Sequence, residues 1–344
     1  MLKDMPICRK SLLLLLLLCR LAPGLVVGQT TTPVCLFRIY EDNDFMNITM
    51  EGTDQAYSNG TRLDMFFTKD HPSRFFLDRW MPKASDSAVN VFGYSLMQQM
   101  YTPEDIRKAY YMPDDYYYAG ALFLTHSLAS YSPQKKVALQ SELLLGIRGP
   151  ASLAGAAQKF VHNMMGYIKP RGWDNQLNTL PLINLNLGLE KQALQLGSGW
   201  LELHGGAQLN AGTMLTQATV YPLLRIGKMT PYYKGTISQY SVDHGAREGK
   251  RAQLYAFFRP RLGWVLNNAM VHGERMNADR PLPASQEVKV VDRSVQHLVT
   301  ELEYGAVLAI GRFGISYTQK HNTEYYKGLY RYSIGNFSIY LSGL

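Results

Sequence analysis

Long runs of two-residue alternation constrain the fold of this chain more than any other feature of its sequence. In residues 254–266 apolar side chains fill every second position, and the positions between them are mixed and include Arg261. Residues 200–211 and 298–310 repeat the pattern, with Glu303 on the polar face. Such strands, with one apolar face, fit an all-β antiparallel transmembrane barrel that has lipid outside and a polar interior. A soluble β-sandwich, with the faces exchanged, is the open alternative.

The stretches between the expected strands bear on topology. A further alternating segment, residues 329–344, fits a last strand that closes a barrel by pairing with the first. Four polar, turn-rich stretches separate strands: 69–86, 102–115, 151–178 and 272–292. We expect the longest of them to be extracellular loops, because periplasmic turns in such barrels are short. No internal repeat or linker is visible, so we expect one domain over residues 29–344.

The first 28 residues read as a cleavable export signal. A basic start is followed by seven consecutive leucines, and the small residues Val26 and Gly28 precede an expected cut ahead of Gln29. The apolar run is too short to span a bilayer as a helix. A lipoprotein signal at Cys19 is disfavoured, because Arg20 follows that cysteine.

Charge and cysteine content narrow the class of protein. The chain has 35 Lys and Arg against 27 Asp and Glu, and its net charge of +8 becomes +5 without the export signal. This excess does not indicate nucleic acid as a partner, although it suits a polyanionic substrate. Only Cys35 lies outside the signal, so we expect no internal disulfide. The 23 tyrosines suit a membrane interface.

One segment, residues 154–166, breaks the strand pattern and predicts a short helix. Apolar side chains recur there at helical spacing, and His162 lies among them. Pro170 and Gly172 follow and end the helix. A lone histidine of this kind is more often structural than catalytic. It becomes a candidate general base where a cation polarises an ester carbonyl nearby.

Two polar runs near the start of the mature chain supply oxygen ligands. Residues 41–44 and 53–60 fall on what we expect to be neighbouring strands, and they include Asn43, Asp44 and Asp54. Carboxylate and amide oxygens are the ligands of Ca²⁺ sites. Solvated turns at strand ends are the alternative interpretation of the same residues.

In order along the chain, these motifs resemble the outer-membrane lipid A 3′-O-deacylases, the LpxR family. The matching residues are Asn43 and Asp44; Thr53, Asp54 and Tyr57 to Gly60; Tyr101 to Pro103; Pro113 to Asp115 with Tyr118 to Gly120; and Gly149, Pro150, Gln158, His162, Gly166 and Gly172 to Gln176. The resemblance covers most of the mature chain. It implies a barrel of about twelve strands in the bacterial outer membrane. It also implies a Ca²⁺-dependent hydrolysis of the ester that holds the 3′-linked acyl or acyloxyacyl group of lipid A.

The resemblance also implies roles for single residues. His162 falls at the position of the catalytic base, which activates a water molecule. Asn43 and Asp44 fall at essential polar positions, and we assign both to catalysis and to binding Ca²⁺. Ser58 falls at the family's hydroxyl residue and is also assigned to catalysis, although water attack needs no acyl-enzyme on it.

Other residues are expected to support these. Lys108 or Arg107 would contact a phosphate of the lipid. A glutamate that some family members carry shortly after the histidine has no counterpart here, where Ile168 or its neighbours stand. We therefore expect Asp174 to support His162, with Asp54 as a further supporting carboxylate.

Two rival functions remain open at this point. A porin-like barrel would need no single critical histidine. An outer-membrane phospholipase would share Ca²⁺ and a histidine but would act on glycerophospholipid, so the acyl product separates it from a lipid A deacylase. In every case we expect a membrane-embedded monomer, and the deacylase would have lipid A or lipopolysaccharide of the outer leaflet as its partner.

Overall fold

The structure is a computed structural model that describes residues 34–48, 56–197, 199–242, 252–277 and 294–343. In these residues it has the strands β1 (Cys35–Asn43), β2 (Ala56–Phe67), β3 (Val89–Thr102), β4 (Ala119–Ser132), β5 (Val137–Arg148), β6 (Leu180–Leu196), β7 (Leu201–Gly212), β8 (Leu215–Lys228), β9 (Ala252–Asn268), β10 (Leu298–Ile310), β11 (Phe313–Asn322) and β12 (Tyr332–Ser342). The expected export signal and Asp54 lie outside the described residues.

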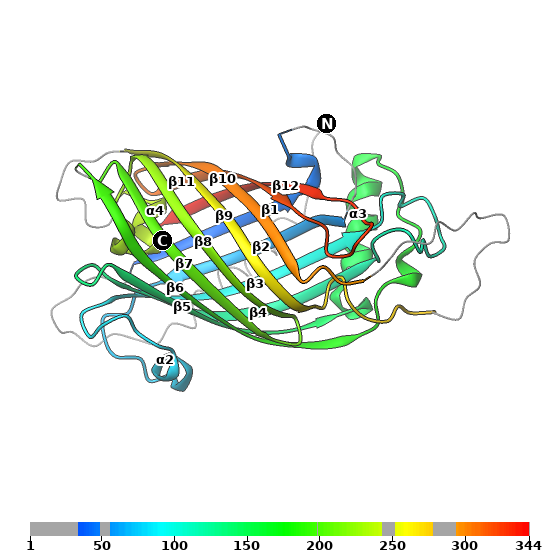
Figure 1. The fold of residues 1–344 in the computed structure, drawn as a ribbon, viewed down its shortest axis with the longest axis horizontal. Helices are drawn as coiled ribbons and strands as arrows, with labels where there is room; N and C mark the ends of the chain where they lie inside the picture. The colour runs from blue at the N-terminus through cyan, green and yellow to red at the C-terminus, as the bar shows by residue number, and fades with distance from the viewer. Residues whose placement is uncertain (1–33, 49–55, 198, 243–251, 278–293, 344) are drawn as a thin grey trace, which may run out of the picture. The chain divides into compact units, whose positions relative to one another are not determined.

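The twelve strands form one closed antiparallel barrel (Figure 1). Each strand pairs with its neighbours in sequence, and β12 closes the sheet against β1 from Leu36 opposite Ser342 to Asn43 opposite Gly335. The barrel confirms the fold predicted by the alternating segments and the family resemblance, and it excludes the sandwich. The closing strand begins at Tyr332, slightly later than the alternation suggested.

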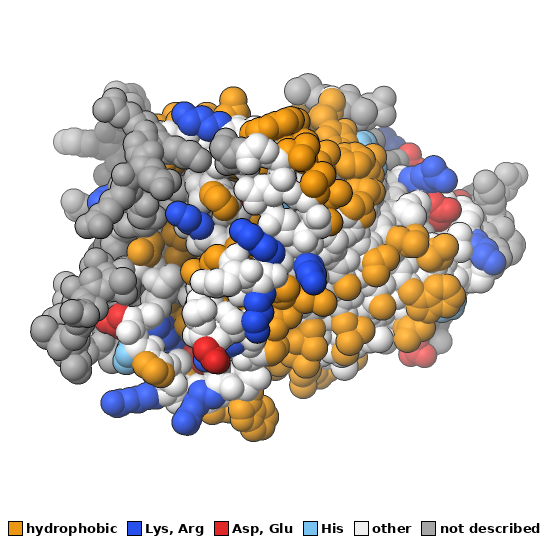
Figure 2. Space-filling view, turned by 60° about the vertical axis from the view of Figure 1, so that its left-hand side comes forward, with side chains coloured by type: hydrophobic (Ala, Val, Ile, Leu, Met, Phe, Trp, Pro, Cys, Tyr) orange, Lys and Arg blue, Asp and Glu red, His pale blue; other side chains and the backbone are white. Residues whose placement is uncertain are grey.

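The wall presents apolar side chains outward and polar side chains inward. Leu254, Leu262 and Trp264 of β9 are exposed, and Figure 2 shows hydrophobic side chains gathered over the barrel wall. Between them, Arg259 points inward and pairs with Glu303 at 2.8 Å. Among the described residues, no helix is long and apolar enough to cross a membrane. The strand faces therefore match the lipid-outside assignment made from the sequence.

Charged side chains and a folded-in connection fill much of the interior. Asp64 bridges Arg38 and Arg62 at 2.7 Å each, and Lys320 reaches Asp42 at 3.1 Å. The connection between β8 and β9 carries η4 (Tyr232–Lys234) and α4 (Thr236–Tyr240), whose buried side chains pack against inward residues of the wall. A polar cavity of about 500 Å³ remains.

The connections divide between two ends of the barrel. One end, which we call the α3 end, carries η1 (Asp44–Met46), η2 (Pro150–Ser152), α3 (Ala154–Met165) and η3 (Trp173–Asn175). The other, the α2 end, carries α2 (Phe76–Trp80) and the η4–α4 connection, and there β1 begins and β12 ends. The helix predicted over residues 154–166 is confirmed as α3.

The four polar stretches divide between the two ends of the barrel, and the two longest, 151–178 and 272–292, both begin at the α3 end. Residues 69–86 join β2 to β3, so they lie at the α2 end, opposite the stretches after β3, β5 and β9. In an up-and-down barrel successive connections alternate between the two ends, so the four stretches cannot share one side of the membrane. The stretch 272–292 is described only as far as residue 277.

Candidate active site

Helix α3 lies on the outer face of the wall, against β3 and β4. On β3 the side chains of Tyr94 and Leu96 are exposed outward, and Gln98, on the same face, donates to the carbonyl of Ser152 at 2.6 Å. A side chain at Gly120 of β4 would collide with Ala154 at the start of α3. Glycine at that position therefore permits the close approach of helix and wall.

The helix turns its polar side to the barrel. Ala154, Gln158 and His162, spaced four residues apart, are its buried residues, and Gln158 accepts a hydrogen bond from the Trp173 indole at 2.7 Å. The apolar positions that predicted the helix are largely on the opposite side, where Phe160 and Met164 are about two thirds exposed (67% and 66%). On a lipid-facing wall this orientation leaves an apolar surface for the membrane and encloses the polar one.

The ring of His162 is held by a backbone carbonyl. Its Nδ1 lies 2.5 Å from the carbonyl oxygen of Ile168, and the side chain is almost fully buried. Because a carbonyl only accepts, Nδ1 carries the proton and the lone pair of the neutral ring is on Nε2. Gly166, with φ of 72°, ends the helix in the left-handed region and turns the chain back toward the ring.

Ile168 thus provides, through its backbone, an acceptor for the His162 ring in the segment where we expected no supporting glutamate. Asp174, which we expected to support His162, lies on η3 with an exposed side chain. The backbone carbonyl of Asp174 accepts a hydrogen bond from Asn277 at 2.8 Å. A backbone acceptor of this kind could not have been found from residue types.

Asn43 and Asp44 lie at the end of β1, where the chain turns into η1. Oδ1 of Asn43 and Oδ1 of Asp44 each accept from the amide of Phe45 at 2.8 Å, so the two oxygens converge on one donor. Asp44 is buried. A side chain at Gly335 of β12 would overlap the backbone of Met46, so glycine allows η1 to fold over the wall.

The side-chain oxygens of Asn43 and Asp44 are of the kind that a hard cation binds. Two oxygens on adjacent side chains lie together, and Ca²⁺ takes such ligands in irregular geometry. In the part of the chain that the structure describes, no three His, Cys, Asp or Glu side chains form a metal-binding group. A cation here would therefore also use amide, hydroxyl or backbone oxygens.

Ser58 lies at an irregularity in β2. The register against β3 shifts between Tyr57 and Asn59, and the Ser58 hydroxyl lies 2.5 Å from that of Thr102. Both side chains are fully buried. The pairing with Thr102, 44 positions away, is a site feature that sequence reasoning missed. Thr102 stood in a recognised motif, but nothing in the sequence indicated its partner.

The two expected phosphate-binding residues follow β3 and differ in their surroundings. The exposed Arg107 forks onto Asp105 at 2.8 and 3.1 Å, and these bonds hold the pKa of Asp105 below its usual value. Lys108 is half-buried in a connection that contacts the segment after α3, where the amide of Arg171 donates to Ile106 at 2.9 Å. The backbone carbonyl of Lys108 also lies close to Gly172 of that segment.

Asp115 fastens this region to the connection before β12. Its carboxylate accepts from the amides of Glu104 at 2.9 Å and Tyr116 at 2.6 Å, and from the Tyr330 hydroxyl at 2.6 Å. Burial raises the pKa of Asp115, since all three of these donors are neutral. This carboxylate orders loops at the α3 end.

The expected residues thus gather on the outer face at one end. η1 contacts the outward hydroxyl of Tyr317 on β11, whereas α3 covers β3 and β4. The outward ends of β1 and β2, with Asn43 and Ser58, lie between these two pieces. The arrangement offers a buried imidazole, clustered oxygens and a lipid-facing helix.

Comparison with known proteins adds the family. The model "LpxR: Outer membrane protein LpxR" matches residues 12–342. The solved structure "LpxR from Salmonella typhimurium" is similar with TM-score 0.70 and 14% identity, over 89% of this chain and 99% of that chain. At this identity the likeness shows the fold alone. No curated protein matches the chain.

Two autotransporter barrels are more distant. The beta domain of Bordetella BrkA has TM-score 0.34 and 11% identity, over 90% of this chain and 98% of that chain. The translocator domain of NalP from Neisseria meningitidis has TM-score 0.40 and 8% identity, over 97% of this chain and 93% of that chain. Similarities at this level support no conclusion about either fold details or activity.

Proposed function

This chain belongs to the LpxR family of outer membrane proteins, and from that premise we propose that it is a Ca²⁺-dependent esterase that removes the 3′-linked acyl or acyloxyacyl group of lipid A. It is an outer-membrane β-barrel, and a lipid substrate in the outer leaflet would approach its wall from outside. The candidate site lies on that outer face, which favours a lipid substrate over a solute in the interior.

The observation that carries the proposal is the burial of His162 and the hydrogen bond of its ring. The ring is enclosed between α3 and the wall, and its Nδ1 proton is committed to the carbonyl of Ile168 at 2.5 Å. Nε2 then takes a proton from water as the water oxygen attacks the ester carbonyl. The same nitrogen returns the proton to the sugar oxygen as the acyl–oxygen bond breaks. General base catalysis of this kind contributes about 10²- to 10⁴-fold.

Asn43 and Asp44 would hold the cation. Bound there, Ca²⁺ would supply positive charge to the ester carbonyl oxygen as it becomes anionic. The buried hydroxyl pair of Ser58 and Thr102 would keep the adjoining strand ends ordered and offer a hydrogen bond to the same region. Water attack requires no covalent step on Ser58.

Positioning of the lipid would fall to α3 and to the connection after β3. Phe160, Met164 and Met165 of α3 are exposed next to the enclosed histidine, and they would contact acyl chains. Lys108 would pair with a phosphate, since Arg107 is already bound by Asp105. We expect the enzyme to act as a monomer.

The test weighs the lipid product. The chain is produced in an outer membrane, and lipid A is extracted with and without EDTA and analysed by mass spectrometry. We expect loss of a 3′-linked acyl or acyloxyacyl mass, abolished by EDTA and by Asp44→Asn. The matched control is Phe45→Ala, since Phe45 is the exposed neighbour of Asp44.

Two outcomes would overturn the proposal. Unchanged lipid A with a folded, heat-modifiable barrel would exclude deacylation, and hydrolysed phospholipid in the same extract would establish the phospholipase alternative. Activity that survives both EDTA and Asp44→Asn would remove the metal from the mechanism while leaving an esterase.

A further inference from the structure

The hydrogen-bonded wall is interrupted between β8 and β9. Val220 pairs with Leu262 and Leu224 pairs with Phe258, but the described ladder has no pairs between 221–223 and 259–261. The register is the same on both sides of the interruption. Pro222 and Pro260 occupy the middle of the two unpaired stretches, and neither has a backbone N–H to donate. The two strands therefore lack ladder hydrogen bonds over this stretch, while their register is unchanged.

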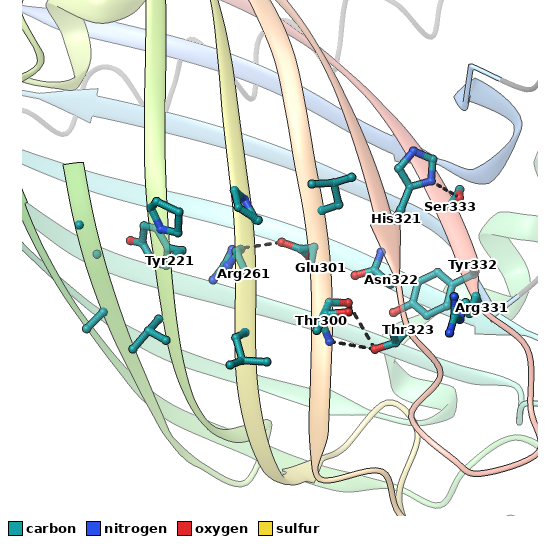
Figure 3. A pocket seen from close by; sticks show the side chains of 18 of the residues that line it. Tyr221, Arg261, Thr300, Glu301, His321, Asn322, Thr323, Arg331, Tyr332 and Ser333 are labelled. Atoms are coloured by element: carbon teal, nitrogen blue, oxygen red, sulfur yellow. Dashed lines mark hydrogen bonds and ion pairs between the residues drawn. The ribbon is translucent and has the colours of Figure 1, made fainter. Parts of the chain in front are cut away.

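A groove of about 1090 Å³ lies over this interruption (Figure 3). We call it the proline groove, and its apolar part is formed by outward residues of four strands: Gly205, Ala207, Pro222, Pro260, Leu262 and Leu302. It follows a row of paired residues across the strands, from Gly205 opposite Pro222 to Leu302 opposite His321 and His321 opposite Ser333. Because barrel strands tilt, this row rises from the middle of the wall to the α3 end.

Two successive glycines give the groove its depth and its floor. A side chain at Gly205 would meet nothing within 4 Å, so the missing side chain leaves space outside the wall. A side chain at Gly206 would collide with the ring of Tyr221, which lies on the inner side. That ring lies 5.5 Å from the Arg259 guanidinium and 5.3 Å from that of Arg261. This layer separates the groove from the interior.

The charges along the groove favour an anionic occupant. Arg261 is paired with Glu301 at 3.4 Å, which leaves Lys191 and Arg331 as the other charged lining residues. The Arg331 side chain is 79% exposed, and its contact with Glu324 is long at 3.5 Å. Thr323 and Ser333 add hydroxyls at the same end, as Figure 3 shows. The groove is apolar in the wall. It has Lys191 beside Gly205 at one end, and Arg331 with the two hydroxyls at the α3 end.

We propose that the proline groove binds one alkyl chain of a phosphate-headed lipid of the surrounding leaflet, with the phosphate against Arg331. The outer face of a membrane barrel contacts lipid, so the occupant comes from the bilayer. A guanidinium suits phosphate because it donates two parallel hydrogen bonds. The groove runs across β6 to β12 and shares no lining residue with the candidate active site, so the proposal does not depend on the proposed function.

The test uses a photoreactive lipid. Lysophosphatidic acid with a diazirine in its chain is mixed into vesicles that contain the full barrel, illuminated, and located by peptide mapping. We expect saturable labelling concentrated on β8, β9 and β10 and competed by unlabelled lysophosphatidic acid. Gly205→Leu fills the groove without a clash and should reduce this labelling severalfold. Ala211→Leu, on the same outward face of β7 but outside the groove, should leave it unchanged.

A second pair of measurements tests the head group. The same diazirine chain ending in an alcohol should label the groove less than the phosphate probe, and Arg331→Gln should abolish the difference. Pro222→Val with Pro260→Val restores two N–H donors and should lower labelling by both probes. Labelling spread evenly around the wall, or unaffected by Gly205→Leu in a folded barrel, would show ordinary contact with bulk lipid and overturn the site. Equal labelling by alcohol and phosphate would overturn the role of Arg331.

Discussion

The two ends of the barrel each hold a buried histidine on the outer face, and the contrast between them shows two different ways in which a protein holds an imidazole ring. At the α3 end, Nδ1 of His162 lies 2.5 Å from the neutral carbonyl of Ile168. At the α2 end, Nε2 of His126 lies 2.6 Å from the Asp78 carboxylate, which also binds Lys69. A carbonyl orients a ring, whereas a carboxylate shared with a lysine fastens one connection to the wall.

The side chains and elements that surround the rings of His126 and His162 also differ. His126 is covered by Phe75, whose ring centroid is 5.3 Å away, and by Tyr94 at 4.7 Å. His162 lies on the buried side of a helix whose other side is exposed, at the same end of the barrel as Asn43 and Ser58. Burial of a histidine side chain therefore does not by itself distinguish a catalytic role from a structural one.

The carboxylates of the two ends repeat the contrast. Asp115 accepts hydrogen bonds from a tyrosine hydroxyl and two amides, and burial raises its pKa. Burial opposes ionisation of Asp78 as well, but hydrogen bonds from Lys69, Ser73 and His126 outweigh it and lower the pKa of that carboxyl. The charge of the donors decides the direction.

The largest effect on deacylation should come from replacing each of the two histidines by alanine in separate variants. His162→Ala should lower the rate of lipid A deacylation by about 10²-fold or more, because a general base is lost. His126→Ala should leave that rate unchanged, since its ring serves the α2 end. Mass spectrometry of lipid A over a time course measures both. Equal losses of deacylation rate in the two variants would mean that His162 and His126 do not differ as a catalytic and a structural residue.

Asp78→Ala should loosen the α2 connection. It removes the partner of Lys69 and His126 and leaves buried polar groups unpaired, at a cost of about 1–3 kcal/mol. Trypsin should then cleave at Arg74 or Arg79 at least several times faster than in the wild type. Asp86→Ala, an exposed carboxylate on the same connection, is the control. Unchanged cleavage in Asp78→Ala would show that apolar contacts of Met81 hold the connection.

At the α3 end, Tyr330→Phe tests the hydrogen bonds that neutral donors make to Asp115. The variant removes one hydrogen bond to Asp115, which contributes about 1 kcal/mol. Amide hydrogen exchange over 323–331 should become severalfold faster, while the α2 connection is unaffected. Tyr110→Phe, on the connection that contains Asp115, should have no effect. Slower or unchanged exchange in Tyr330→Phe would argue that Asp115 is held by its two amide donors alone.

The smallest effects should appear on acidification, with opposite sign at the two ends. The folded state raises the pKa of Asp115, so it binds the proton more tightly than the unfolded state, and this fastening weakens as pH rises through the folded-state value. The folded state lowers the pKa of Asp78, so its contribution is complete above the ordinary value of about 3.9 and is lost as pH falls through the lower folded-state value.

Spin labels report on both ends at once. Arg79→Cys and Lys327→Cys, each labelled in a Cys35→Ser background, should respond in different pH ranges as pH is lowered: the label at residue 327 above about 4 and the label at residue 79 below it. The label at residue 79 should become more mobile and the label at residue 327 less mobile. Asp78→Asn and Asp115→Asn should remove the respective responses. Changes of the same sign at both ends would show that acid acts on the whole barrel and not on the two carboxylates.

Much of the fold could be predicted because its signals are local. Alternation in 254–266 specifies which side chains face lipid, and the helical spacing in 154–166 specifies a helix. The end at which the stretch 69–86 lies could not be predicted in this way, because loop length does not encode which end a connection occupies. Counting strands does, since each strand reverses the chain direction.

Less of the candidate site could be predicted from the sequence. The residue types of Asn43, Asp44, Ser58 and His162 could be carried over from the family pattern, and the structure brings their elements to one end. The carbonyl of Ile168 and the hydroxyl of Thr102 could not be predicted as partners. The first is a backbone atom, and the second is joined to Ser58 only through strand pairing.

The sequence by itself determined a barrel wall, its lipid-facing side, a short helix and the residue types of a candidate esterase site, because periodicity and motifs are properties of neighbouring residues. Only the tertiary structure decided that α3 turns Gln158 and His162 to the wall and its apolar side outward, that Asp78 takes His126 as a partner, and that Pro222 and Pro260 lie opposite each other in the proline groove. These contacts join residues far apart in the chain, and their geometry exists only once closure of the sheet fixes which strands are neighbours and in what register.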